Sequence, residues 1–361
     1  MKKRIVWITA DYFIDVDILL VPYIQENYSD WQVDWYVLKT ANNIPLPEDK
    51  VTKIFPVKYR GKDPRIILSY MKAFREMRLK DADLIYSDFV GVPYYFPLLH
   101  NLYKKKIVVH AAHNVKPYDV WPNALIQYVK YVFTHNKHFQ IFSKEQLNYA
   151  EKTYKGNDYF YCPMTIKSYG EVRTNNYDVN TDKLNLLFFG NVIDNKRLDL
   201  LIETIKELPQ NVKDKLHLTI AGNNKNKEKY NALIGNEKCI SAFFKRIDDE
   251  EVPELFVKHD FLMLTYEAVA QSGPHMIAYN YNLPVIASDI SGFSERVEDG
   301  DNGLLFKVND KQSLKDAILR AVNMNQNEYT SMKANLYLYT QKNHSVESAA
   351  KRYMEYFQKH V

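Results

Sequence analysis

Residues 261–288 read FLMLTYEAVAQSGPHMIAYNYNLPVIAS and predict the fold of the region around them. The apolar run Phe261–Leu264 predicts a buried strand, and a second strand is expected at Val285–Ala287. Between them lie a polar loop with Gln-Ser-Gly at 271–273 and a helix that starts at Pro274, a residue favoured in a first helical turn. Because the first amides of a helix are unpaired and carry the positive end of its dipole, this loop is a natural phosphate-binding site.

Length and composition indicate a globular protein of about two domains. The chain has 361 residues, of which 46% are hydrophobic and 25% charged, and its formal net charge of +4 does not indicate a nucleic-acid-binding protein. Two cysteines, Cys162 and Cys239, imply no disulfide framework. The first apolar run is broken at Asp11, too short for a signal peptide, and no window is apolar enough to span a membrane. We therefore expect a cytoplasmic protein.

Short apolar segments alternate with helical ones in both halves of the chain, which predicts α/β domains with doubly wound parallel sheets. The polar, aperiodic stretch 168–182 is the best linker candidate. We expect an N-terminal domain of residues 1–170, joined by a C-terminal helix of residues 345–361, and a second domain of residues 171–344. The strands of the first series are predicted at Arg4–Thr9, Val33–Leu38, Lys53–Pro56, Leu84–Tyr86 and Ile107–His110, and the second series starts at Asn185–Phe189.

Residues 63–80 have the spacing of an amphipathic helix. Packing of its apolar side on a sheet is the favoured interpretation, and docking on anionic lipid is the alternative. The apolar side is formed by Ile66, Ile67, Tyr70, Met71, Phe74 and Met77, and the remaining surface is rich in Lys and Arg.

A family resemblance is carried by Glu267, the Gln-Ser-Gly that follows it, and the run from Ala287 to Phe306. Together these resemble the nucleotide-sugar loop of family 4 glycosyltransferases, in the subgroup in which a Glu precedes Gln-Ser-Gly. The commoner pattern has a second Glu eight residues later, where this chain has His275; counted back from the following strand, the position is Ile277. The resemblance implies the GT-B architecture, two Rossmann-like domains that face each other across a cleft.

The resemblance also implies a donor site in the second domain. Lys196, near the start of a helix, and the amides of Ser272 and Gly273 would meet the diphosphate, and Glu267 would position the sugar. Lys196 and Glu267 are therefore predicted to be catalytic, together with His113 in the first domain. The predicted donor-binding residues are Gly190, Asn191, Arg197, Gly222, Arg246, Gln271, Ser272, Gly273 and Glu295.

The acceptor side is predicted in the first domain. The segment from His110 to Pro117 follows a strand and resembles the family's His-Asn-x-x-Pro region, so that His113 would face the transferred sugar or the acceptor hydroxyl, with Asn114 beside it. A histidine bonded inside a loop is the alternative for His113. The first strand is followed by no glycine turn, so Asp11 or Asp15 would take its role. A zinc site at these histidines is not expected, because no third ligand is suggested by the spacing.

These features predict a glycosyltransferase that moves a hexose from a nucleotide-diphosphate sugar to a glycan or lipid-linked acceptor in surface polysaccharide biosynthesis. Family resemblance alone implies retention of configuration, no metal requirement, and peripheral contact with the cytoplasmic membrane face. The alternatives are a nucleotide-sugar 2-epimerase of the same architecture and a non-catalytic nucleotide-sugar or carbohydrate-binding relic. A metal-dependent GT-A enzyme is disfavoured because two βα series are present, and a dinucleotide oxidoreductase because no Gly-x-Gly-x-x-Gly follows a predicted strand.

Overall fold

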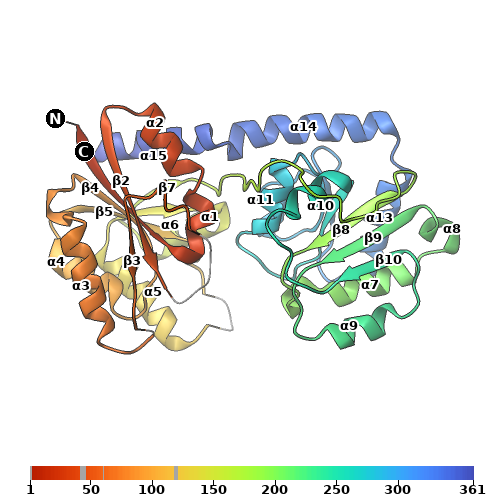
Figure 1. The fold of residues 1–361 in the computed structure, drawn as a ribbon, viewed down its shortest axis with the longest axis horizontal. Coiled ribbons are helices and arrows are strands. Elements are labelled where there is room, and N and C mark those ends of the chain that lie inside the picture. Colours follow the sequence, from red (N-terminus) through yellow and green to blue (C-terminus); the bar gives the residue numbers. More distant parts are fainter. Residues whose placement is uncertain (1, 41–45, 60, 118–120) are drawn as a thin grey trace. The chain divides into compact units, whose positions relative to one another are not determined.

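A computed structural model describes residues 2–40, 46–59, 61–117 and 121–361 (Figure 1). The chain divides into two compact units, one formed by Met1–Thr165 and Ser345–Val361 and the other by Ile166–His344. Among the described residues, no helix is both long enough and apolar enough to cross a bilayer.

The first unit is built on a parallel sheet of seven strands in the order β3-β2-β1-β4-β5-β6-β7. The order reverses between β1 and β4, the kind of position at which open α/β sheets bind ligands beyond their strand ends. Its strands are β1 (Lys3–Ala10), β2 (Trp31–Lys39), β3 (Lys53–Pro56), β4 (Leu84–Asp88), β5 (Ile107–Ala112), β6 (His138–Ile141) and β7 (Asp158–Tyr161). Its helices are α1 (Ile14–Asp17), α2 (Leu20–Asn27), α3 (Ile66–Glu76), α4 (Tyr95–Tyr103), α5 (Asn123–His135), α6 (Lys144–Thr153) and α15 (Val346–His360), with 3₁₀ turns η1 (Asp11–Phe13) and η2 (Leu79–Asp81).

The second unit has a parallel sheet of six strands in the order β10-β9-β8-β11-β12-β13, which reverses between β8 and β11. Its strands are β8 (Leu184–Phe189), β9 (Leu216–Ala221), β10 (Ile240–Phe243), β11 (Phe261–Leu264), β12 (Val285–Ser288) and β13 (Leu304–Phe306). Its helices are α7 (Leu198–Lys206), α8 (Gln210–Lys213), α9 (Lys227–Ile234), α10 (Val252–Lys258), α11 (Gly273–Asn280), α12 (Ser291–Ser294), α13 (Lys311–Asn323) and α14 (Gln326–His344), with the 3₁₀ turn η3 (Asp194–Lys196).

The boundary between the units falls at Thr165–Ile166, five residues before the position expected from the sequence. Backbone hydrogen bonds explain the difference, because they attach the intervening residues to the second unit. The amide of Ile166 donates to the carbonyl of His344 at 3.0 Å, and that of Lys167 donates to the carbonyl of Met276 at 3.3 Å. Lys167 is thereby fixed beside α11.

The last helix, α15, belongs to the first unit. Its Tyr353 and Phe357 are fully buried, and both contact the ring of Trp7 on β1, with centroid distances of 5.1 and 6.2 Å. Burying two aromatic side chains of this size contributes several kcal/mol, which holds the helix on the unit.

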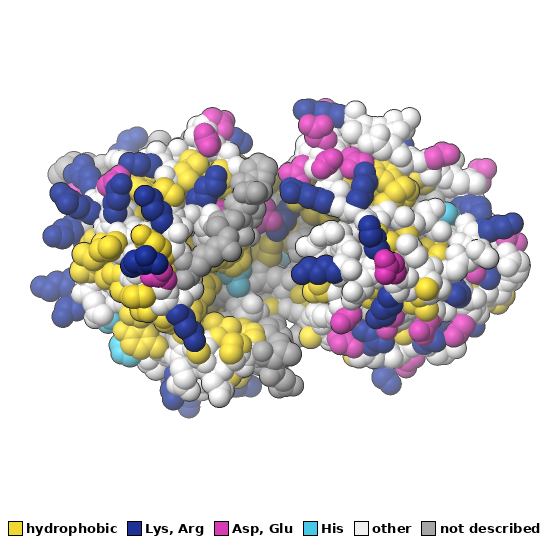
Figure 2. All heavy atoms as spheres, turned by 60° about the horizontal axis from the view of Figure 1, so that its bottom comes forward, with side chains coloured by type: hydrophobic (Ala, Val, Ile, Leu, Met, Phe, Trp, Pro, Cys, Tyr) yellow, Lys and Arg dark blue, Asp and Glu magenta, His cyan; other side chains and the backbone are white. Residues whose placement is uncertain are grey.

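Helix α3 follows the packing interpretation, since Tyr70 and Phe74 are each 1% exposed in the core. Met71 is 48% exposed, so its expected place on the apolar side is wrong. At 100° per residue Met71 lies one position beyond the stripe through Ile66, Tyr70 and Phe74, and it joins the exposed Leu68. Figure 2 shows basic side chains spread over the first unit, with hydrophobic ones exposed between them.

Candidate functional site

Two glycines close the carboxyl ends of β8 and β9. Gly190 has a φ of +99°, a conformation that favours glycine, and Gly222 follows β9. A Cβ atom on Gly222 would lie 2.0 Å from the carbonyl oxygen of Gly190, so only glycine permits this approach. The two turns therefore pack backbone to backbone beyond neighbouring strands, of which β8 borders the point where the strand order reverses.

Lys196 lies against the Gly190 turn. A Cβ atom on Gly190 would be 2.9 Å from Lys196 Nζ and 3.5 Å from Cγ of Pro274, so the ammonium group and the first turn of α11 meet at this glycine. The side chain is buried, with an exposed fraction of 8%, and Nζ donates a long hydrogen bond of 3.4 Å to the carbonyl of Phe189. In the part of the chain that the structure describes, Lys196 forms no ion pair.

Burial without an anionic partner lowers the pKa of Lys196 to about 8. Burying an ammonium group without a counter-ion costs free energy, and a bound anion would offset this cost. The ring of Tyr266, 5.2 Å from Nζ, supplies only a cation–π contact. The arrangement is thus suited to a ligand with negative charge.

The first turn of α11 completes the site. Ser272 caps the helix, with Oγ accepting from the amide of His275 at 3.4 Å, and the side chain is 6% exposed. A Cβ atom on Gly273 would lie 3.3 Å from Nζ of Lys167, which is also buried. Two buried lysines, Lys167 and Lys196, therefore reach the amino-terminal turn of the same helix, where the unpaired amides and the helix dipole favour an anion.

Lys167 was missed by the sequence analysis. It lies in the segment that leads into the second unit, and neither periodicity nor spacing marks it. Its backbone bond to Met276 brings it to α11. Gln271, predicted from the loop motif, has a buried Oε1 without a hydrogen-bond partner among the described residues.

Arg197 and Glu267 pair with each other, with 2.8 Å between Nη1 and Oε1. Arg197 also bonds Asp199, so its charge is satisfied inside the protein rather than held for a phosphate. The Glu267 side chain is 43% exposed. The pair neutralises itself, whereas Lys196 has no ion-pair partner among the described residues.

The other predicted donor-binding residues differ from Lys196 in exposure or in ion pairing. Asn191 and Arg246 are exposed. Glu295 forms an ion pair of 2.6 Å with the neighbouring Arg296.

In the first unit, His113 follows β5 and is held on three sides. Its Nε2 lies 2.8 Å from Oδ1 of Asp88, and its ring is stacked between Phe13 and Phe142, with centroid distances of 3.9 and 4.3 Å. Because a carboxylate only accepts, Nε2 carries a proton and Nδ1 is left as the basic nitrogen of the neutral ring. An apolar cavity of about 190 Å³, lined by His113 and Trp121, lies beside it.

Asp88 ends β4 at the switch point of its sheet and was not predicted. Its side chain is 1% exposed, and its Oδ2 has no partner among the described residues. Asp17, also buried, accepts hydrogen bonds from Trp7 and Thr9. Desolvation, strengthened by the charge of Asp88, raises the pKa of Asp17 well above its usual range.

The remaining acceptor-side residues differ from the prediction. Asp11 is fully buried, and its two carboxylate oxygens accept from the amide and hydroxyl of Thr40. It ties the end of β1 to the residue after β2 and presents no carboxylate to a ligand, which corrects its predicted role. Asp15 is half-buried in the first turn of α1, and Asn114 is exposed.

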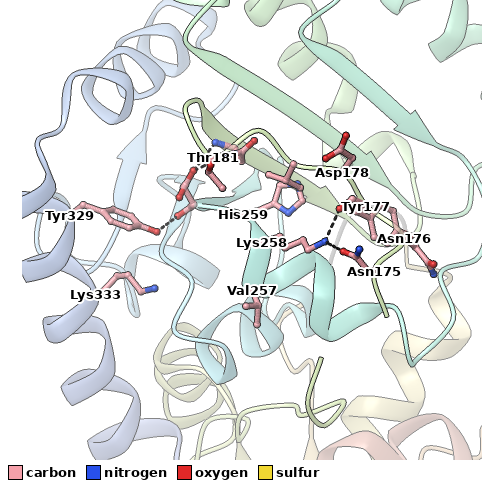
Figure 3. A pocket seen from close by; sticks show the side chains of 13 residues that line it. Asn175, Asn176, Tyr177, Asp178, Thr181, Val257, Lys258, His259, Tyr329 and Lys333 are labelled. Carbon is pink, nitrogen blue, oxygen red and sulfur yellow. Dashed lines mark hydrogen bonds between the residues drawn. The ribbon is translucent and has the colours of Figure 1, made fainter. Parts of the chain in front are cut away.

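A larger cavity of about 630 Å³ lies elsewhere in the second unit, at the amino ends of β8 and β11 (Figure 3). It is lined by Lys258, whose Nζ donates to Asn175 Oδ1 at 2.6 Å and to the carbonyl of Tyr177 at 2.8 Å. Since strands of a parallel sheet all point the same way, this cavity is at the opposite edge from Gly190 and the α11 loop. Lys258 is already satisfied by these bonds, whereas Lys196 has no ion-pair partner among the described residues, so the turn beside Lys196 is the better anion site.

The lowered pKa of Lys196 predicts how the free energy of unfolding depends on pH. Between the native pKa of about 8 and the unfolded value near 10.4, the unfolded state binds more protons, so stability rises with pH across this window. Lys196→Met should raise the free energy of unfolding at pH 7 by roughly 3 kcal/mol and remove this rise. Urea unfolding of both proteins between pH 7 and 10.5 measures the effect; parallel pH profiles would contradict it.

Comparison with known proteins agrees with this geometry. Residues 173–338 match the family model for glycosyl transferases group 1. The chain is 25% identical over 182 residues to an uncharacterized glycosyltransferase, MJ1069, of Methanocaldococcus jannaschii, covering 50% of this chain and 46% of that protein. The chain thus aligns with about half the length of that relative.

Solved structures extend the likeness to the whole chain. A glycosyltransferase from Rickettsia africae ESF-5 superposes with a TM-score of 0.79 at 15% identity, covering 99% of this chain and 98% of that one. Anabaena Alr3699/HepE in complex with UDP and glucose superposes with a TM-score of 0.74 at 14% identity, covering 99% and 100%. The predicted α/β fold with two Rossmann-like sheets is confirmed, and it is the GT-B fold of glycosyltransferases.

Proposed function

We propose that this protein is a family 4 glycosyltransferase of the Glu…Gln-Ser-Gly subgroup, which transfers a hexose from a nucleoside-diphosphate sugar to a hydroxyl of a glycan or lipid-linked acceptor. One observation carries the proposal. Two buried lysines, Lys167 and Lys196, reach the amino-terminal turn of α11. The complex of the Anabaena protein with UDP and glucose supports the choice of a nucleotide sugar as the anion.

The lysines and the helix end supply what the leaving group needs. As the bond between sugar and diphosphate breaks, negative charge grows on the phosphate oxygen. Lys196 Nζ, Lys167 Nζ and the amides of the α11 turn are fixed before the reaction, so they stabilise this charge without reorganisation. These cations take the place that a metal ion fills in other transferases, so we propose a metal-independent reaction.

The stereochemistry belongs to the same proposal. Attack by the acceptor hydroxyl on the face that the diphosphate leaves would retain the configuration, with a phosphate oxygen taking the hydroxyl proton. Glu267 would hold a hydroxyl of the sugar, for which it must exchange its exposed ion pair with Arg197. Exposed pairs of this kind are worth little, so the exchange costs little.

His113 and Asp88 are proposed to orient the acceptor. Asp88→Asn replaces the carboxylate that fixes the His113 tautomer, so transfer should fall by roughly 10- to 100-fold while donor affinity is unchanged. Steady-state kinetics with varied acceptor, together with calorimetric donor binding, measures the two effects. His135→Gln, at an exposed histidine of the same unit, is the matched control. Equal loss of donor binding and transfer would contradict an acceptor-side role.

The setting proposed for the reaction is the cytoplasmic face of the membrane, in surface polysaccharide biosynthesis. Helix α3 presents Leu68 and Met71, which are 67% and 48% exposed, beside the exposed Arg65 and Lys72. Apolar side chains among basic ones suit the surface of an anionic bilayer. This supports a peripheral contact near a lipid-linked acceptor.

The proposal is tested by incubating the full chain with a panel of nucleoside-diphosphate hexoses, with and without acceptor. Acceptor-dependent release of the nucleoside diphosphate is the expected result. Isomerised or free sugar from donor alone identifies the 2-epimerase alternative. Binding without turnover of any donor identifies the non-catalytic relic.

A further inference from the structure

A second cluster of ligating side chains lies in the first unit, away from the His113 pair. It consists of His138 on β6, Asp158 on β7 and His360 on α15. One ligand atom from each lies within 4.8 Å of the other two. His138 and Asp158 pair in register at the amino ends of their strands, whereas His113 follows the carboxyl end of β5. The cluster is therefore at the opposite edge of the same sheet.

A tyrosine fixes the protonation of His138. The hydroxyl of Tyr356 donates to the carbonyl of Asp158 at 3.3 Å, and Nδ1 of His138 lies 3.0 Å from the same hydroxyl. The hydroxyl has one proton, so when it donates to the carbonyl, Nδ1 of His138 is the donor in the second contact. Nε2 of His138 is then left with a free lone pair, the form in which imidazole binds metals.

His360 contributes a second, independent observation. Its Nε2 is buried and forms no hydrogen bond among the described residues, although Oδ2 of Asp158 is 3.1 Å away. The rings of His138 and His360 are 4.6 Å apart, at an angle of 67°. Two imidazoles and a carboxylate thus converge, and neither histidine has a strong alternative partner for its ligating nitrogen.

We propose that His138, Asp158 and His360 bind a divalent transition-metal ion, with Zn²⁺ as the best match. Zn²⁺ prefers imidazole and carboxylate ligands, with bonds of about 2.0–2.2 Å. Tetrahedral bonds of this length place ligand atoms about 3.3 Å apart, so atoms that now lie within 4.8 Å of one another need to close by at most about 1.5 Å. Water would take the fourth position.

Two features define what the ion does. Its ligands come from three elements distant in the sequence, so it would tie the last turn of α15 to β6 and β7. The site is independent of the proposed sugar transfer. The Nζ of Lys359 lies 3.7 Å from Oδ2 of Asp158 and would have to move away when the ion binds. Its side chain is 68% exposed and can turn into solvent.

The test uses the untagged full chain, stripped with EDTA and dialysed. We expect calorimetry to give one Zn²⁺ per chain, the melting temperature to rise with Zn²⁺ but not with Mg²⁺, and Co²⁺ to give the intense visible absorption of a tetrahedral site. His360→Gln and His138→Gln should each weaken Zn²⁺ binding by at least about 100-fold, because each removes one of three ligands.

His135→Gln, an exposed histidine on α5, is the matched control and should bind as the wild type does. Circular dichroism before titration shows that each variant is folded; if His138→Gln is not, Asp158→Asn replaces it. Zn²⁺ binding that is absent, or that is unchanged in both ligand variants, would overturn the proposal. Loss of binding in His135→Gln as well would move the site elsewhere.

Discussion

Replacing Lys196 with methionine should abolish measurable sugar transfer and weaken nucleoside-diphosphate binding by at least about 100-fold. The ammonium group is buried, has no ion-pair partner among the described residues, and lies at the Gly190 turn beside Pro274. Removing one preorganised donor to a developing anion commonly costs about 10²–10³ in rate. Steady-state turnover and calorimetric titration measure the two losses.

The design separates this effect from unfolding. Lys196→Met is expected to be more stable than the wild type, because the buried charge is gone, so lost activity with raised stability identifies a functional cation. Lys238→Met, at an exposed lysine of the same unit, makes the same side-chain replacement and the same change in net charge. Its turnover should stay within about twofold of the wild type. Turnover of Lys196→Met within tenfold of the wild type would refute the diphosphate assignment.

Gly222→Ala should strongly destabilise the second unit. The added Cβ would lie 2.0 Å from the carbonyl oxygen and 2.6 Å from the carbonyl carbon of Gly190, both backbone atoms that cannot turn away. Overpacking of this kind typically costs 1–3 kcal/mol, and we expect about 3 kcal/mol here because the β8 and β9 turns must separate. For a unit of this size the melting temperature should fall by roughly 6–12 °C.

The matched control is Gly235→Ala in the same unit. Gly235 also has a positive φ, of +62°, but the nearest atom to its added Cβ is 4.0 Å away. Its φ of +62° and ψ of −128° strain any residue with a Cβ atom, so the substitution should cost about 1–2 kcal/mol from backbone conformation alone. Differential scanning calorimetry compares the two variants, and equal losses of stability would show that the contact between Gly190 and Gly222 is not the cause.

The fold was predictable because its signals are local. Continuous apolar runs such as Phe261–Leu264 mark buried parallel strands, and Pro274 after Ser-Gly marks a helix start; α11 begins at Gly273, one residue earlier than expected. The loop at 271–273 was expected directly before this helix, and Ser272 within it is the cap. Met71 was placed on the buried side of α3 from its spacing alone, and spacing does not define where the apolar side of a helix ends.

The site was predictable only where its chemistry lies in one segment. Lys167 and Asp88 were missed because tertiary contacts bring them to their partners, Lys167 through Met276 and Asp88 through His113. Arg197 was predicted to bind phosphate, yet it forms ion pairs with Asp199 and Glu267. Glu267 is distant from Arg197 in the sequence. Tertiary contacts decide whether a charged side chain forms an ion pair, and these contacts cannot be read from residue spacing in the sequence.

The most direct test of the central claim is a crystal structure of the full chain with the nucleoside diphosphate that raises its melting temperature most. The account predicts the β-phosphate within hydrogen-bond distance of Lys196 Nζ and the amides at Ser272–Gly273, with Lys167 Nζ on the same group. A diphosphate bound instead at the cavity beside Lys258, with the α11 turn empty, would contradict it.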